Sequence, residues 1–227
     1  DLTLPELLDV WPLPVADGAR EWVVENMQGG RVFDGQYAVN IPDGMLARLD
    51  DGTPLPEEAV NFTFRMDGTD VNYIDGMPPV GDVSGHAKLT GDTFEAWIDS
   101  GTIQLDEARD VALREGHFIK HELDNKKKPG VIDFTVAGKT SDLLGLLDHD
   151  PLNLIGKFGL DPMKVAGTGR IDGHIVLPLV KEVTFDDVDF SGKAQAANIA
   201  IPNIQPDISV TGGALSIDVT RSGMSAS

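Results

Sequence analysis

The chain has 227 residues, and 41% of them are hydrophobic, which suffices for one or two domains with a shared core. Acidic residues outnumber basic ones by 37 to 18, and the resulting net charge of -19 disfavours nucleic acid and anionic lipid head groups as partners. Because the chain has no cysteine, a disulfide framework, thiolate catalysis and the usual zinc ribbons are excluded.

Residues 1–30 are predicted to form a Pro-rich segment followed by a helix. Apolar residues recur there at helical spacing, namely Ala19, Trp22, Val23 and Met27. This spacing predicts a helix over residues 17–28, with Asp17 as its N-cap and Gly29 and Gly30 as its end. We expect this helix to lie across one end of a sheet and to cover apolar strand residues.

Residues 31–139 are predicted to form an antiparallel β-meander. Apolar and polar residues alternate strictly after position 59, so that one side of a strand carries Val60, Phe62, Phe64 and Met66. The same alternation returns over residues 93–99, 131–137 and 171–177. Clusters of Gly, Asp, Asn and Pro divide the region into candidate strands at residues 31–41, 59–67, 69–74, 82–90, 92–99, 101–105, 108–114 and 116–122.

Residues 140–162 are predicted to form a helical insertion, and residues 163–227 to form a second β segment of the same continuous sheet. The insertion carries an apolar stripe of Leu143, Leu144 and Leu147. The stripe predicts a short helix over residues 141–149. The predicted fold class is therefore mainly β, an elongated and curved antiparallel sheet that forms a groove, with two short helical insertions. A β-sandwich is the alternative, because a second sheet would also cover an apolar face.

No motif in the chain predicts catalysis. His117 and His121 could bind zinc from one face of a helix, but the alternation around Gly116 predicts a strand, in which residues four apart lie too far from each other. The acidic clusters lack the spacing of a calcium loop and fit turns instead. Neither a nucleophile elbow nor a nucleotide-binding glycine pattern is present. We expect no enzymatic activity, no catalytic residue, no metal and no cofactor.

Several short segments resemble one protein family when they are taken in order. They are Trp11-Pro12, Ala19–Trp22, Asn26–Arg31, Val71–Tyr73, Gly76–Pro79, Asp92–Ala96, Leu143–Leu147 and Leu177–Leu179. Together they are similar to the AsmA-like proteins of the YhdP branch, which carry a domain of unknown function and occur in the membranes of many proteobacteria. The resemblance covers most of the chain.

The resemblance implies a role in lipid transport. Proteins of this family are large, are anchored in the inner membrane by an N-terminal helix, and look like relatives of bridge-like lipid transfer proteins, whose periplasmic β-rich part forms a groove for acyl chains. It implies that this chain is one periplasmic segment, without the anchoring helix, that shields phospholipid acyl chains between the inner and outer membranes. Its expected partners are those acyl chains and neighbouring segments of the same large protein.

The apolar face of the alternating strands is the candidate lipid path, because an acyl chain needs a dry and continuous surface without catalytic groups. The candidate lipid-facing residues are Val60, Phe62, Phe64, Met66, Phe94, Ile98, Ile132, Phe134, Val136, Ile171, Ile175 and Leu177. Each of them could instead pack against protein, since alternation identifies a buried face without naming what buries it. The rival functions are a structural or protein-binding β-domain of the cell envelope and a carbohydrate-active enzyme with paired acids.

Overall fold

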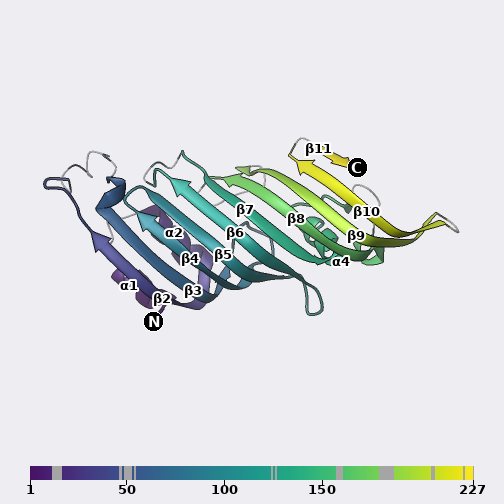
Figure 1. Cartoon of the computed structure of the whole chain (residues 1–227), viewed down its shortest axis with the longest axis horizontal. Coiled ribbons are helices and arrows are strands. Elements are labelled where there is room, and N and C mark those ends of the chain that lie inside the picture. Colours follow the sequence, from purple (N-terminus) through teal and green to yellow (C-terminus); the bar gives the residue numbers. More distant parts are fainter. Residues whose placement is uncertain are drawn as a thin grey trace.

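The strands of the chain form one antiparallel sheet in which every strand pairs with its neighbours in sequence (Figure 1). The computed structural model describes residues 1–11, 17–45, 48, 53, 55–123, 125, 127–156, 161–178, 187–205, 208–221 and 223–226. Within these residues the sheet has 11 strands and no crossover connection. The prediction of a mainly β, antiparallel and elongated sheet is confirmed, and the described residues contain no second sheet of a sandwich.

The strands follow one another from one end of the sheet to the other. They are β1 (Leu2–Thr3), β2 (Met27–Val39), β3 (Val60–Val71), β4 (Val80–Thr90), β5 (Thr93–Gln104), β6 (Asp110–His121), β7 (Gly130–Lys139), β8 (Ala166–Leu177), β9 (Asp189–Gln205), β10 (Ile208–Thr220) and β11 (Gly223–Ala226). The central strands are 10 to 12 residues long, about twice the common strand length.

Three of these strands are longer than predicted, because glycines that were expected to end a strand lie inside one. Gly68, Gly101 and Gly116 are interior residues of β3, β5 and β6. Gly116, for example, pairs with residues on both neighbouring strands. Gly68 adopts a φ of 69°, which glycine tolerates, and it lies where the register between β3 and β4 shifts. The glycines therefore bend the strands without interrupting them.

Helices lie on one face of the sheet, two near its first strands and one over β6 to β8. They are α1 (Leu4–Val10), α2 (Asp17–Asn26) and α4 (Thr140–Leu147), together with the short 3-10 turns η1 (Glu57–Ala59) and η3 (Pro162–Lys164). No helix is predicted from the sequence at α1. Its N-terminus is a capping box, in which the backbone N–H and the hydroxyl of Thr3 both donate to Glu6 Oε2, at 2.7 and 2.8 Å.

The predicted end of α2 was wrong by a few residues. The helix stops at Asn26, and the chain enters β2 at the next residue. Gly29 and Gly30 therefore belong to a strand, where they adopt φ values of 66° and 71°. The side chain of Asp17, the predicted N-cap, lies outside the described ones.

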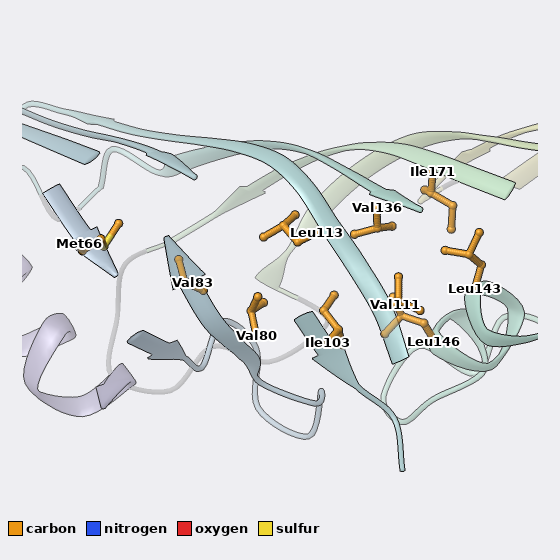
Figure 2. Packing of buried hydrophobic residues seen from close by; sticks show 10 residues of the cluster. All are labelled: Met66, Val80, Val83, Ile103, Val111, Leu113, Val136, Leu143, Leu146 and Ile171. Carbon is orange, nitrogen blue, oxygen red and sulfur yellow. The ribbon is translucent and has the colours of Figure 1, made fainter. Parts of the chain in front are cut away.

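The apolar core lies between the helices and the sheet face that they cover. Under α4, Leu143 and Leu146 pack on Val111, Val136 and neighbouring strand residues (Figure 2). Under α1 and α2 a second cluster forms, which contains Leu4, Leu7, Val23, Val32, Phe64, Ala87 and Ala96. The third cluster surrounds Trp11 and contains Met45, Leu55, Ala59, Val60 and Leu89. The sheet face is thus covered by protein over its first strands and over β6 to β8.

Candidate functional site

An apolar cavity of about 260 Å³ occupies the covered face of the sheet. Its walls come from strands β2 to β8, from α1, α2 and α4, and from the loop between β3 and β4. Among the described residues that line it there is no Asp, Glu, Lys or Arg. The polar ones are Thr69, Tyr73 and His117, and the ring of His117 points to the other face of the sheet, toward Trp97 and Glu95. Such a wall offers dispersion contacts and dryness but almost no directional recognition.

Ten of the twelve candidate lipid-facing residues line this cavity. They are Phe64, Met66, Phe94, Ile98, Ile132, Phe134, Val136, Ile171, Ile175 and Leu177. Alternation placed them on one face correctly because the strands keep their register across most of the sheet. Whether lipid contacts them remains a prediction.

Val60 and Phe62 do not line the cavity. Val60 is buried in the cluster around Trp11, so protein already covers it. The Phe62 ring packs edge-on against Tyr37, with centroids 6.2 Å apart, and at 5.1 Å from Phe64. Trp11, which follows α1, covers the groove beside Val60. The helix α1 was not predicted from the sequence.

Some cavity residues outside the strands were not predicted from the sequence. They are Leu4 and Leu7 of α1, Tyr73, Ile74 and Met77 of the loop between β3 and β4, and Leu146, Leu147 and Leu152 in and after α4. For α1 a signal existed, since Thr3 and Glu6 have the spacing of a capping box. For the loop there was none, because its apolar residues follow no period.

The middle of the groove is less covered than its ends. Four large cavity-lining residues are only half-buried there: Ile98, Ile132, Phe134 and Ile175. We call these four residues the open stretch. Under the helices, by contrast, strand residues such as Val111 and Val136 are almost fully buried. The open stretch is therefore an apolar surface that the described part of the protein does not seal.

Tyr73 brings a polar group to the cavity wall. Burial raises the pKa of its phenol well above the usual value, so the group is a neutral donor at ordinary pH. Within the described residues its hydroxyl makes no hydrogen bond. The Tyr73 residue is half-buried by exposed area, and a carbonyl oxygen of a ligand in the cavity would supply a partner for its hydroxyl.

The opposite face of the sheet is polar. Trp97 lies between His86 and His117, with ring centroids 4.8 and 5.4 Å away, and His117 Nε2 lies 2.7 Å from Glu95 Oε1. Further along, Arg170 donates to Asp172 at 2.7 Å and thereby lowers the pKa of that carboxyl. The contacts of Trp97 and His117 join neighbouring strands and stabilise the sheet, whereas Arg170 and Asp172 both lie on β8.

The histidines on this face have partners other than a metal. His121 lies four residues beyond His117, and its Nδ1 is 3.2 Å from the hydroxyl of Thr93. Among the described residues, no group of three or more His, Asp or Glu side chains could hold an ion. None of the helices described in the structure is long and apolar enough to cross a membrane.

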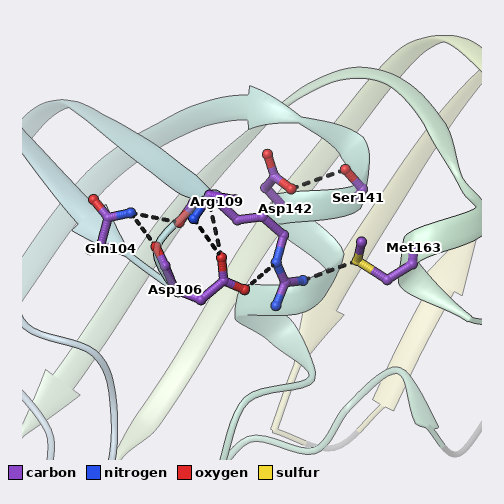
Figure 3. A network of polar contacts seen from close by, with 7 residues as sticks. Gln104, Asp106, Arg109, Ser141, Asp142 and Met163 are labelled. Atoms are coloured by element: carbon purple, nitrogen blue, oxygen red, sulfur yellow. Dashed lines mark hydrogen bonds and ion pairs between the residues drawn. The ribbon is translucent and has the colours of Figure 1, made fainter.

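A polar network lies beside α4 at its end of the groove (Figure 3). Arg109, in the turn between β5 and β6, donates from Nε to Asp106 at 2.7 Å and from Nη1 to Met163 Sδ at 3.2 Å. Asp106 also accepts the backbone N–H of Ala108, the main cause of its lowered pKa. The Arg109 side chain passes beside Gly145 of α4, where an added Cβ would lie 3.2 Å from Nη1.

Comparison with known proteins found no match. A scan against models of protein families, a search of curated proteins and a search of solved structures each gave no similar protein for this chain.

Proposed function

We propose that this chain shields phospholipid acyl chains in its apolar groove, as one periplasmic segment of an AsmA-like protein that carries lipid between the inner and outer membranes. The open stretch is the observation that supports this most directly. Four large apolar side chains remain half-buried in a cavity whose described lining has no charged side chain. A well-formed apolar cavity of this kind is the default candidate for a ligand site. The lipid and the compartment come from the family resemblance.

The groove is long and narrow, as an extended acyl chain is. The lining runs from β2 to β8, and six steps of about 4.8 Å between neighbouring strands give a length of about 29 Å. A volume of about 260 Å³ is small for a ligand site, which favours a single narrow chain.

Lipid extraction and a matched pair of variants test this proposal. Ile132 and Val131 are adjacent on β7 and both half-buried, but only Ile132 lines the cavity. A charge is costly where water is excluded, so Ile132→Asp should weaken binding of a fluorescent acyl-chain probe at least about tenfold. Val131→Asp should stay within about twofold, because its side chain points to the other face of the sheet, away from the cavity.

Two results would contradict the proposal. One is a purified protein that extracts no lipid from vesicles and binds no acyl-chain probe. The other is equal binding by the two Asp variants, with folding of both verified by circular dichroism. In either case the groove would be ordinary core and not a lipid path.

A second candidate function rests on the outer edge of β2. The short strand β1 pairs only with Arg31 and Val32, so the described residues leave the remainder of this edge unpaired. Tyr37 and Val39 lie on it and are 61% and 45% exposed. Such an edge can accept a strand from another protein or segment, as a protein-binding β-domain of the cell envelope would. Tyr37→Lys and Val39→Lys should abolish the binding of a partner at this edge and leave lipid binding unchanged.

A further inference from the structure

A row of directly paired residues runs along the floor of the groove and alternates between large apolar residues and glycine. From β3 to β8 its members are Met66, Gly85, Ile98, Gly116, Phe134 and Gly173. Directly paired residues on neighbouring strands have Cβ atoms about 5 Å apart, so two large side chains at such positions contact each other. In this row Ile98 and Phe134 have glycine on both sides, and Met66 has Gly85 on one side and Val32 on the other.

The large residues do not use this space equally. The Phe134 ring lies over Gly173 of β8, where an added Cβ would overlap the ring. Gly116 of β6, on the other side of Phe134, has no ring over it. An added Cβ there would meet Ile98 Cβ at 3.3 Å and the carbonyl oxygen of Asp133 at 3.9 Å. Gly116 itself lines the cavity. At Gly116 the groove floor therefore carries no side chain between Ile98 and Phe134, and Ile98 borders this gap on one side.

We infer that a single acyl chain crosses β6 over Gly116, between Ile98 and Phe134, and that Gly116 sets the length of chain that the groove accepts. The inference rests on the proposed function. Gly116 lies between the part of the cavity under α1 and α2 and the part near α4. A side chain at this position would divide the cavity in two. A short chain would still fit into either part, whereas a long chain would have to pass the obstruction.

The test measures binding of fluorescent fatty-acyl probes of eight and sixteen carbons to the purified chain and its variants. Gly116→Val should reduce affinity for the sixteen-carbon probe at least about tenfold, because several methylenes lose their apolar contacts. Its affinity for the eight-carbon probe should stay within about twofold. Gly138→Val is the control, since Gly138 lies on β7 outside the cavity lining and an added Cβ there has its nearest neighbour at 3.7 Å.

A second variant protects the test against misfolding. Ile98→Trp narrows the same point from β5, and it should show the same selective loss of the long probe. Circular dichroism and thermal melting verify folding of each variant, and Ile98→Trp decides if Gly116→Val does not fold.

The outcomes separate this inference from the proposed function. If the unmodified chain binds the long probe and the folded variants bind it equally well, the path over Gly116 is wrong and lipid binding stands. Equal loss of both probes would make Gly116 a structural residue and would also overturn the inference. If the unmodified chain binds neither probe, the proposed function falls and this inference falls with it.

Discussion

At the scale of single residues, Tyr73 shows how partial removal from water changes the pKa of a side chain. Its raised pKa means that the folded protein keeps the phenol protonated after the unfolded chain, with a pKa of about 10, has released the proton. The stability linked to this group is fully present below about pH 10 and is lost as pH rises further, by at most about 1.4 kcal/mol per pH unit.

Tyr73→Phe should therefore flatten the loss of stability above about pH 10. The measurement is the free energy of unfolding in urea on both sides of that pH. The chain has two tyrosines, so Tyr37→Phe, at an exposed position on β2, is a natural control. Identical alkaline profiles for Tyr73→Phe and the unmodified chain would show that the phenol reaches water.

What the sequence could predict at this scale was the direction of side chains. Phe94, Ile98 and Phe134 were placed on the cavity side because a period of two leaves no other choice once the face is known. Residues whose environment depends on distant contacts escaped prediction. Lys120 is the clearest case, because it is buried and its ammonium donates to carbonyls of the turn after β6, including Asn125 at 3.0 Å and Lys128 at 2.9 Å.

At the scale of elements, α4 shows how a short helix becomes stable. Eight residues are too few for a helix to form alone, so its stability comes from packing on the sheet. Leu143 and Leu146 are buried against β6 and β8 residues, whereas the neighbouring Leu144 is only half-buried. The Arg109 side chain, which bonds to Asp106 and Met163, lies beside Gly145 of the same helix.

This arrangement predicts different costs for two adjacent leucines. Leu143→Ala should lower the free energy of unfolding by about 2–5 kcal/mol, since it removes a buried side chain and leaves a cavity. Leu144→Ala should cost about 1 kcal/mol or less, as expected for a partly exposed position. Denaturant titration gives both values. A cost for Leu144→Ala as large as that for Leu143→Ala would mean that α4 docks with a different face.

Elements were predictable where a local pattern fixes them. The leucine stripe indicated α4 within two residues of its bounds, and alternation indicated the central strands. Strand ends were harder, because Gly68, Gly101 and Gly116 look like breaks in the sequence while backbone pairing continues through or beside them. The helix α1 was hidden by prolines, one of which occupies its first turn, where proline is compatible with a helix.

At the scale of the whole molecule, alternation alone could not reveal which strands the helices cover. They lie over the first strands and over β6 to β8, with an apolar stretch between them. A period of two predicts a buried face, but the cover over that face depends on where the helices dock, and this is a matter of tertiary contacts. Trp22 of α2 illustrates the point. Its ring stacks on Phe118 of β6 with centroids 6.4 Å apart, and both residues line the cavity.

The charge of the whole molecule should select among lipids that the groove itself cannot distinguish. The described residues of the groove wall include no charged side chain, so acyl chains of equal length should bind alike. Under the proposed function, the head group would stay in water near acidic loops. Asp75 lies between the cavity residues Ile74 and Met77, and Asp150 between Leu147 and Leu152. With a net charge of -19, the surroundings of the groove repel an anionic head group more than a zwitterionic one.

Extraction of phosphatidylcholine should therefore exceed extraction of phosphatidylglycerol with the same acyl chains at low ionic strength. At 1 M salt, where charges are screened beyond about 3 Å, the difference should largely vanish. Uptake of phosphatidylcholine should persist there, because apolar contacts are not screened and water is no better a solvent for the acyl chain. The measurement is mass spectrometry of lipid bound to the protein after incubation with vesicles of each lipid. Equal uptake of the two lipids at low salt would show that the head group lies beyond the reach of the acidic loops, and loss of both at high salt would mean that charge, and not the apolar groove, holds the lipid.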